Sequence, residues 1–457
     1  MIEIIMNNVS TKLKNIPSSL IDTISNELSF TIKGFGFSKT TNLFDVQNQI
    51  IPTGLVPRLV KLLIKKNIFY KIIDERVKHK PNASYSLNDN YIARDYQQEI
   101  IDRATSREII QAATGAGKTF IMYSLIRKFS VKPTIVIAPK VSLAEQIKKE
   151  FESFSGQEIG ICTGFTKNIK DITICTPQSV PKKLLKEAKA IFFDEAHNIP
   201  SHTIYNVANQ AINAYYRIGV SATPWRDGGD DLLIEAVLSI RKPHLSINAS
   251  KLIKKGKLTP CNIFFIRYNK EFQWQGNYNE TYRIAISENE ERNNIIVKLA
   301  KKASFQKNRT TLILINQIKH GEILLNKLSE NTSSKEYIVN GERLKINEVE
   351  FLSGRDSSNR REAVFQSIRD GFTKILIGST IADEGLDLPP LDCLILAGSG
   401  KSSTRAFQRI GRVLRLYKNK KNAIIFDFAD ATKTFNYHYK VRKALYETEP
   451  LWNINYI

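Results

Sequence analysis

The sequence of 457 residues has few cysteines, prolines and glycines and no long apolar run. Its four cysteines are widely spaced without a C-x-x-C pair, which argues against a zinc or dithiol motif, so we expect them to be reduced core residues. With 22 glycines and 15 prolines, the composition excludes a collagen-like or linker-like chain. The most hydrophobic stretch, residues 59–73, is interrupted by lysines well short of the roughly 20 residues that span a bilayer. We therefore expect neither a membrane-spanning helix nor extensive disorder.

Acidic residues are also in deficit. The chain has 45 Asp and Glu against 67 Lys and Arg, which leaves a net charge of +22 at pH 7. Such a surplus favours a polyanionic partner, most often nucleic acid, and we expect no membrane partner. The N-terminus has an early Glu3 and lacks the basic region and apolar core of a signal peptide, so we expect a cytoplasmic protein.

Apolar patterning divides the chain into four parts. Residues 1–88 combine short β-like runs with one helical stretch, and the polar segment 78–90 indicates a linker, so we expect the first part to be removable without unfolding the rest. Residues 89–240 and 295–457 alternate β-branched runs with helical segments, which is typical of parallel sheets with crossover helices. Residues 241–294 are less regular and are expected to form a connector. The predicted fold class is α/β, with two tandem parallel-sheet domains preceded by a small basic α+β domain. The expected strands are residues 107–111, 134–138, 172–175, 190–193 and 217–220, and then 311–315, 336–339, 374–378, 393–396 and 423–428.

The strongest local signal lies between an expected strand at 107–111 and an expected helix at 118–129. The pattern is that of a Walker A phosphate loop with alanine in the first glycine position, and a plain glycine-rich turn is the alternative. Such a loop presents backbone N–H groups and a helix N-terminus to phosphates. Lys118 is expected to reach the β- and γ-phosphates of a nucleoside triphosphate, and Thr119 to bind Mg²⁺. The residues assigned to this loop are Ala112, Ala113, Thr114, Gly115, Ala116, Gly117, Lys118 and Thr119.

Two adjacent carboxylates, Asp194 and Glu195, end the apolar strand at 190–193. Ligands bind beyond the C-terminal ends of parallel strands, which puts Asp194 beside the phosphate loop, where it can hold Mg²⁺. Glu195 is then placed to orient or deprotonate the attacking water. Taken alone, Asp-Glu after a strand is more often a helix start, but the Walker A pattern upstream reverses this preference.

With these patterns in place, residues 194–197 resemble the DEAH box of superfamily 2 helicases and translocases, and further motifs of that superfamily follow in order. The resemblance implies adenine recognition, by a Q motif, for Arg94, Tyr96 and Gln97. It implies contacts with the nucleic-acid backbone, by motifs Ia and Ib, for Pro139, Lys140, Thr176, Pro177 and Gln178. It implies coupling of hydrolysis to domain movement, by motif III, for Ser221, Ala222 and Thr223.

The second α/β part carries the remaining motifs of the resemblance. Residues 312–316 resemble motif IV, 380–387 motif V and 408–415 motif VI. The resemblance implies that motif V contacts nucleic acid through Thr380 and ATP through Gly385 and Asp387. It implies two RecA-like domains, with His197 relaying the γ-phosphate state toward motif III or Gln408. Arg412 and Arg415 are expected to stabilise charge on the transferring phosphoryl group, although a solvated basic helix face is the alternative for this spacing.

The N-terminal part places Arg58, Lys61 and Lys65 on one face of its expected helix. A plain solvated face is the more common interpretation of such a pattern, and contact with phosphates is the alternative assigned to these residues. Residues 50–63 also resemble the corresponding part of phage UvsW-type helicases, which implies remodelling of branched DNA by branch migration, fork regression or unwinding. We therefore expect an ATP- and Mg²⁺-dependent DNA helicase that acts as a monomer on single-stranded, forked or four-way-junction DNA. An RNA helicase of the same superfamily and an ATP-gated clamp that does not translocate are the alternatives.

Overall fold

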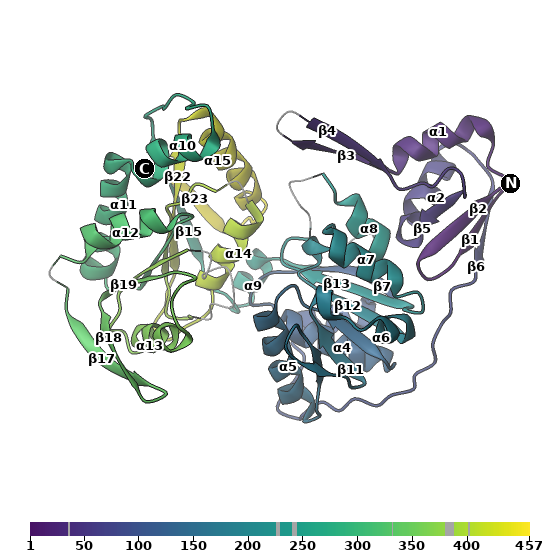
Figure 1. Ribbon diagram of the computed structural model, residues 1–457, viewed down its shortest axis with the longest axis horizontal. Coiled ribbons are helices and arrows are strands. Elements are labelled where there is room, and N and C mark those ends of the chain that lie inside the picture. Colours follow the sequence, from purple (N-terminus) through teal and green to yellow (C-terminus); the bar gives the residue numbers. More distant parts are fainter. Residues whose placement is uncertain (35–36, 225–228, 240–244, 331, 380–387, 401–402) are drawn as a thin grey trace. The chain divides into compact units, whose positions relative to one another are not determined.

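The computed structural model describes the chain except for residues 35–36, 225–228, 240–244, 331, 380–387 and 401–402 (Figure 1). The chain divides into two compact units, Met1–Ile247 and Asn248–Ile457. Each unit contains a mostly parallel sheet flanked by helices, as the alternating pattern predicts. No helix in the described parts of the chain is long and apolar enough to cross a bilayer. All four cysteines are buried, and none of them forms a disulfide.

The first unit begins with a small α+β domain whose sheet has the strand order β5-β2-β1-β6. Strand β1 pairs antiparallel with β2 and parallel with β6. Helix α2 tolerates Pro57 in its first turn, where a missing N–H costs no helical hydrogen bond, and it buries Leu59 and Leu63 in the domain core. The elements of this domain are β1 (Ile2–Met6), β2 (Ser10–Lys14), α1 (Ser18–Glu27), β3 (Ser29–Gly34), β4 (Phe37–Asn42), β5 (Ile50–Pro52), the 3-10 turn η1 (Thr53–Leu55), α2 (Val56–Lys65) and β6 (Tyr70–Asp74).

The α/β domain of the first unit has the strand order β10-β9-β11-β8-β12-β13-β7-β14, in which only β10 runs antiparallel to its neighbour. Its five predicted strands and the predicted helix at 118–129 agree with the structure to within one residue at each end. The elements are α3 (Asp95–Arg103), β7 (Arg107–Ala112), α4 (Lys118–Phe129), β8 (Thr134–Ile137), α5 (Val141–Ser155), β9 (Gly160–Cys162), β10 (Lys167–Asn168), β11 (Ile172–Cys175), η2 (Pro177–Ser179), α6 (Lys182–Glu187), β12 (Ala190–Asp194), η3 (Ala196–Asn198), α7 (His202–Gln210), β13 (Tyr216–Ser221), α8 (Leu232–Leu238) and β14 (Leu245–Ile247).

The N-terminal domain packs against helix α8 of this α/β domain. Leu232 and Ala236 of α8 belong to the same buried cluster as the core of the N-terminal domain. The guanidinium of Arg58 donates hydrogen bonds to both carboxylate oxygens of Glu235 (2.8 and 3.0 Å) and pairs with Glu27 at 3.2 Å. Arg58 thus joins the N-terminal domain to α8, and its contact with phosphates stays a prediction.

Lys61 and Lys65, the other two residues of the predicted basic face, are exposed. Unlike Arg58, neither side chain takes part in a described contact between the two domains of the first unit. Their role as phosphate contacts stays a prediction.

The segment expected to be a linker, residues 78–90, has no helix or strand, yet it is bound to the α/β domain. The buried Tyr85 donates a hydrogen bond to the carbonyl of Val131 at 3.1 Å. The hydroxyl of Tyr123 donates to the carbonyl of Ser86 at 2.6 Å. Removing the N-terminal part would break such contacts and uncover the apolar face of α8. That the rest of the chain folds without residues 1–88 stays a prediction.

The second unit contains a parallel sheet with the strand order β19-β20-β16-β21-β22-β15-β23. Its core lies between this sheet and its helices. The elements are α9 (Ala249–Lys254), β15 (Cys261–Tyr268), α10 (Tyr278–Tyr282), the π-helical turn η4 (Arg283–Ser287), α11 (Glu290–Lys301), η5 (Lys302–Gln306), β16 (Thr311–Leu314), α12 (Ile318–Leu328), β17 (Ser334–Val339), β18 (Glu342–Asn347), β19 (Val349–Leu352), α13 (Ser358–Arg369), β20 (Ile375–Gly378), β21 (Cys393–Leu396), α14 (Ser403–Val413), β22 (Ala423–Asp430), α15 (Lys433–Tyr446) and β23 (Trp452–Tyr456).

Two expectations for the second unit differ from the structure. The strand predicted at 336–339 belongs to a hairpin of β17 and β18 outside the parallel sheet, because Asn340 and Gly341 both adopt positive φ and form a tight reversal. Residues 241–294, expected to form a connector, contribute β14 to the first sheet and β15 to the second. Strand β15 lies between β22 and β23, where its apolar run is covered on both sides.

Gly54 provides a test of the contact between the N-terminal domain and α8. A Cβ at this position would lie 2.1 Å from the carbonyl oxygen of Glu235 and 2.4 Å from that of Ala236. Because both atoms belong to the backbone, Gly54→Ala should push the two surfaces apart and lower the free energy of unfolding by about 1–3 kcal/mol. Gly164→Ala is the matched control, since a Cβ there meets nothing within 4 Å. Equal midpoints of thermal unfolding for the two variants would contradict this packing.

Candidate active site

The predicted phosphate loop connects β7 to α4 at the C-terminal edge of the first sheet. Gly115 and Gly117 have φ angles of +86° and +79°, which lie in the left-handed region that favours glycine. A Cβ at Gly117 would also lie 2.5 Å from Nε2 of Gln97. Lys118 is the first residue of α4, so the loop ends at a helix N-terminus whose free N–H groups suit an anion.

The predicted Q-motif residues hold this loop from the start of α3. Nε2 of Gln97 donates a hydrogen bond to the carbonyl of Ala116 at 2.8 Å, and its Oε1 accepts one from the backbone N–H of Arg94 at 2.9 Å. The hydroxyl of Tyr96 donates to the same carbonyl at 3.3 Å and accepts from Nη1 of Arg94 at 2.9 Å. In this structure the three side chains therefore fix the shape of the loop, and adenine recognition by them stays a prediction.

The two predicted acids follow β12, which lies between β8 and β13 in the sheet. Glu195 adopts φ +49° and ψ +57°, a conformation that costs energy for a non-glycine residue and is concentrated at functional sites. Its Oε1 forms an ion pair with Nζ of Lys118, so the acid pair and the phosphate loop meet directly.

His197 and Ser221 complete a hydrogen-bonded group around Glu195. The hydroxyl of Ser221 donates to Oε2 of Glu195 at 3.2 Å and accepts from the backbone N–H of Thr223 at 3.2 Å. Nδ1 of His197 lies 3.0 Å from the Ser221 hydroxyl and 3.3 Å from Oε2 of Glu195. Of the two directions expected for His197, the structure contains the contact with the motif III segment, where Ala222 is also buried.

The two acids have opposite pKa shifts. Burial, reinforced by the neighbouring charge of Glu195, raises the pKa of Asp194 above its ordinary value. Burial also acts to raise the pKa of Glu195, but the charge of Lys118 and the contacts with His197 outweigh it and leave that pKa below its ordinary value. Glu195 is thus held as a carboxylate, whereas Asp194 is a half-buried acid without full compensation for its charge.

The predicted nucleic-acid contacts of motifs Ia and Ib follow β8 and β11, which are neighbouring strands. Pro139 is half-buried and Lys140 exposed where the chain enters α5. Thr176 and Pro177 are buried at the start of η2, and Gln178 is exposed. Only Lys140 and Gln178 therefore offer exposed side chains, while the buried residues can shape the backbone.

In the second unit, helix α14 carries the predicted motif VI. Gln408 and Arg412 lie on this helix, Arg415 follows its last turn, and all three side chains are half-buried. Nζ of Lys420 donates to the carbonyls of Val413 (2.6 Å) and Arg415 (2.9 Å) and so fixes the end of the helix. The predicted motif V residues Thr380, Gly385 and Asp387 lie outside the described residues.

A group of buried residues that the sequence did not single out holds the loop before α14. The side chains of Arg292, Tyr282 and Arg442 donate hydrogen bonds to the carbonyls of residues 397, 398 and 400 at 2.7, 3.0 and 2.9 Å. Ser399, between them, has a φ of +40°, outside the usual range for a serine.

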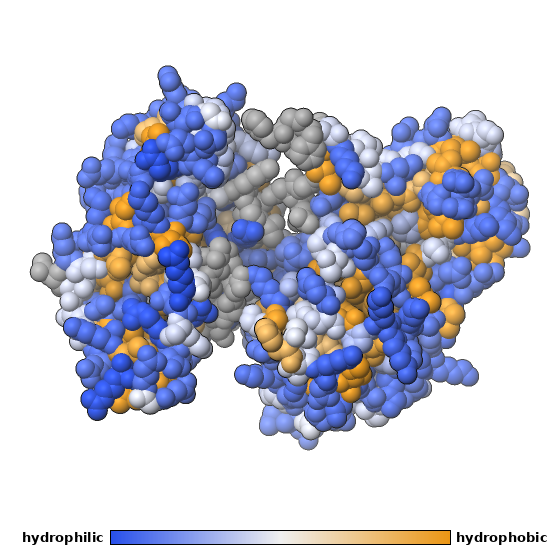
Figure 2. All heavy atoms as spheres, viewed as in Figure 1, coloured by the Kyte–Doolittle hydropathy of each residue, from blue (hydrophilic) through white to orange (hydrophobic). Residues whose placement is uncertain are grey.

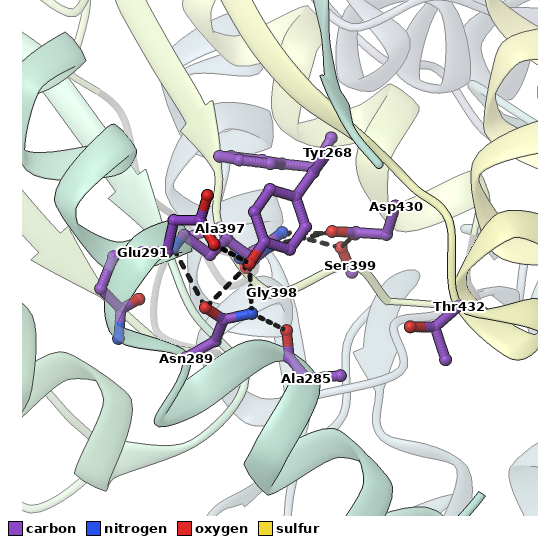
Figure 3. Close-up of polar contacts among 12 residues, drawn as sticks. Tyr268, Ala285, Asn289, Glu291, Ala397, Gly398, Ser399, Asp430 and Thr432 are labelled. Atoms are coloured by element: carbon purple, nitrogen blue, oxygen red, sulfur yellow. Dashed lines mark hydrogen bonds and ion pairs between the residues drawn. The ribbon is translucent and has the colours of Figure 1, made fainter. Parts of the chain in front are cut away.

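The arginines of this group are paired with buried acids. Arg292 lies 2.9 Å from Asp430. Asp430 also accepts a hydrogen bond from Ser399 (Figure 3). Arg442 forms two hydrogen bonds of 2.8 Å to Asp427. Breaking one such pair would leave an uncompensated buried charge, so the loop has little freedom to move. In the sequence, Arg292 and Arg442 stand out only as charged residues on the mostly apolar, buried faces of α11 and α15.

Two family models match the chain. Residues 90–226 match the res subunit of type III restriction enzymes, and residues 291–417 match the helicase conserved C-terminal domain.

Several relatives are similar over most of the chain. A DNA 3'-5' translocase XPB2 from Sulfurisphaera tokodaii is 26% identical over 365 residues, which are 75% of this chain and 82% of that protein. The ATP-dependent DNA helicase uvsW of Enterobacteria phage T4 is 26% identical over 423 residues, 84% of this chain and 80% of that protein. A putative DNA 3'-5' helicase Rad25 from Haloarcula marismortui is 27% identical, and the chain spans half of its length.

Solved structures share the fold at low identity. A fragment of a putative HsdR subunit of a type I restriction enzyme from Vibrio vulnificus is 16% identical with a TM-score of 0.56, covering 93% of this chain and 81% of that chain. S. cerevisiae Dbp5 bound to RNA and ADP BeF3 is 15% identical with a TM-score of 0.52, covering 79% of this chain and 89% of that chain. The phosphate loop, the acid pair and both family models agree, and the chain belongs to superfamily 2 of the ATP-dependent helicases.

Proposed function

We propose that the chain is an ATP- and Mg²⁺-dependent motor that moves on DNA and remodels branched DNA by branch migration, fork regression or unwinding. The observation that carries this proposal is the shared sheet edge of the first unit, where the phosphate loop, the acid pair and the predicted backbone contacts follow neighbouring strands. Similarity to a DNA translocase and to a phage DNA helicase, each over most of its length, supports DNA as the partner. The net charge of +22 is consistent with either DNA or RNA as the partner.

Lys118 is central to the proposed chemistry because one cation has two anionic partners. In this structure its ammonium pairs with Glu195. The β- and γ-phosphates compete for the same charge, so binding of ATP draws Lys118 away and allows the pKa of Glu195 to rise. Glu195 then becomes a better acceptor for the proton of the attacking water. His197 and Ser221 keep its other oxygen in place during this exchange.

Asp194 and Thr119 are the proposed Mg²⁺ ligands. The half-buried carboxylate of Asp194, whose pKa is raised by desolvation and by a neighbouring acid, fits a cation because the cation would compensate both effects. The hydroxyl of Thr119 lies in the first turn of α4, beside the loop. When bound, Mg²⁺ supplies neutralisation of phosphate charge.

The second unit is proposed to contribute Arg412 and Arg415 to the γ-phosphate and Gln408 to sensing it. A cation on the transferring phosphoryl group stabilises charge that develops in the transition state. The buried ion pairs support this role, because their arginines also hold the carbonyls of residues 397 and 400 shortly before α14. Thr380, Gly385 and Asp387 are proposed as the motif V contacts with DNA and ATP.

The exposed side chains of Lys140 and Gln178 are proposed to bind the DNA backbone. The acid pair ends β12, which lies beside β8. A change of contacts at the γ-phosphate can therefore be transmitted to this surface through Ser221 and its neighbours. Lys61 and Lys65 are proposed to add phosphate contacts from the N-terminal domain.

The partner is tested by measuring ATP hydrolysis with single-stranded DNA, forked DNA, a four-way junction and duplex RNA at equal nucleotide concentration. We expect DNA to stimulate hydrolysis more than RNA, and branched DNA to be preferred. Stimulation by RNA alone would contradict the proposal and favour an RNA helicase.

Replacing Glu195 tests the exchange of partners by Lys118. Glu195→Gln should retain ATP binding and reduce kcat by about 10² or more, because an amide cannot accept the proton. The variant should also bind ATP at least as tightly as the parent, since Lys118 no longer has a competing carboxylate. Glu99→Gln on the exposed surface of α3 is the matched control, and its kcat should not change.

Lys118→Ala should abolish hydrolysis and leave DNA binding within a few-fold, measured by fluorescence anisotropy. Loss of ATP binding in Glu195→Gln, or near-normal hydrolysis in Lys118→Ala, would contradict the proposed roles.

Arg412 on α14 and Arg415 after its last turn are tested by measuring ATP hydrolysis. Arg412→Ala and Arg415→Ala should each lower kcat by about 10² or more, with a much smaller change in ATP affinity, because the lost charge acts on the transition state. Arg369→Ala, at an exposed ion pair in the same unit, is the control and should retain its rate. If both variants keep full kcat and unfold at the parental temperature, the second unit supplies no arginine to the reaction.

A further inference from the structure

The turn between β9 and β10 presents an aromatic ring to solvent. Phe165 is 94% exposed, although much of the visible face of the molecule is hydrophilic in Figure 2. Single exposed apolar residues are common on protein surfaces, so the exposure alone assigns no role to this ring. What distinguishes Phe165 is the place of its turn in the first sheet.

The turn continues the row of strand ends at which the predicted backbone contacts lie. Strand β9 pairs parallel with β11, and β11 pairs parallel with β8. The N–H of Thr176 donates to the carbonyl of Cys162 at 3.0 Å, and that of Ala138 donates to the carbonyl of Cys175 at 3.0 Å. Neighbouring strands lie about 4.8 Å apart, so the turn after β9 and the end of β8 are separated by about 10 Å. A few nucleotides of an extended strand span this distance.

The charge around the turn suits a polyanion. Residues 160–170 contain two lysines and no acidic residue, and Lys167, close to the ring, is exposed. The acids that flank this segment, Glu158 and Asp171, precede β9 and β11 and so lie at the opposite edge of the sheet, where each pairs with a lysine. No carboxylate of this segment therefore opposes a phosphate beside Phe165.

Thr163 holds the turn in one conformation. Its N–H donates to the carbonyl of Thr166 at 2.8 Å, and its hydroxyl accepts hydrogen bonds from the N–H groups of Phe165 (3.4 Å) and Thr166 (3.3 Å). A ring that a preformed turn already presents to solvent needs little ordering when it binds. Proteins hold single strands by cations for the phosphates and aromatic rings for the bases, whereas the core of a protein interface is a wider apolar surface.

We propose that Phe165 stacks on an unpaired base of the DNA strand whose backbone Lys140 and Gln178 bind. The edge of the first sheet then holds this strand by a base as well as by its phosphates. Bases within a duplex are already stacked on each other, so the contact selects single-stranded DNA. This inference rests on the proposed function, because it names the form of DNA that the proposed backbone contacts receive.

Replacing the ring tests the proposal. Phe165→Ala removes the ring and Phe165→Trp retains one that can stack, while Phe69→Ala is the matched control, since Phe69 is 83% exposed in the N-terminal domain. Binding of a single-stranded oligonucleotide is measured by anisotropy over a range of salt concentrations. We expect Phe165→Ala to weaken binding at least about fivefold, and Phe165→Trp and Phe69→Ala to bind like the parent. The slope of log Kd against log salt should not change, because the ring neutralises no phosphate.

An abasic strand of the same length shows whether the ring contacts a base. This probe keeps the backbone phosphates and lacks every stacking partner, so the parent and Phe165→Ala should bind it equally. Lys140→Ala should reduce the salt slope by about one on either strand. With saturating intact strand, kcat for ATP hydrolysis by Phe165→Ala should equal that of the parent, and only the DNA concentration that gives half-maximal stimulation should rise.

The failure of this inference differs from that of the proposed function. If single-stranded DNA stimulates the parent but Phe165→Ala binds it with parental affinity, Phe165 does not stack on DNA. Equal weakening on the intact and abasic strands, or equal weakening by Phe69→Ala, would also overturn the assignment of a base to this ring. If no DNA stimulates the parent, the DNA motor itself is contradicted.

Discussion

Parallel pairing of β11, β8, β12, β13 and β7 is the constraint on which the candidate site depends. It brings the C-terminal ends of five strands to one edge, so that residues far apart in sequence become neighbours there. The apolar strands form a rigid sheet, and the segments that follow them carry the candidate functional residues. Glu195 illustrates this division, because it adopts a costly backbone conformation immediately after the buried strand β12. The strained residue is held by an ion pair on one oxygen and by hydrogen bonds on the other.

The two units have different means of fixing their functional residues. In the first, the ion pair of Lys118 and Glu195 is accessible to a competing anion, so the arrangement is suited to change when phosphate arrives. In the second, buried pairs such as Arg442 and Asp427 hold the loop before α14, where a change would leave a buried charge uncompensated. The proposed exchange of partners thus concerns the first unit, whereas the buried pairs fix a loop within the second.

The sequence predicted the strands and the phosphate loop closely, because local signals such as the β-branched run of β11 or the glycines of the loop determine them. It could not predict interactions whose partners are distant in sequence. Arg58 has the spacing of a solvated face, and only the fold brings Glu235 to it. Strand β15 lacks the flanking pattern of its neighbours and becomes a central strand because β22 and β23 pair with it. Arg292 and Arg442 belong to no recognisable sequence motif, because the partners of a buried charge pair can lie at any distance from one another in the sequence.

The central claim is that hydrolysis at the Lys118 and Glu195 site drives movement along DNA. Displacement of the third strand from a triplex on duplex DNA tests it most directly, because a moving protein removes that strand without unwinding the duplex. The account predicts displacement with ATP by the parent chain, and none with a non-hydrolysable ATP analogue or with Glu195→Gln. Hydrolysis stimulated by DNA without any displacement would contradict the account and would leave an ATP-gated clamp.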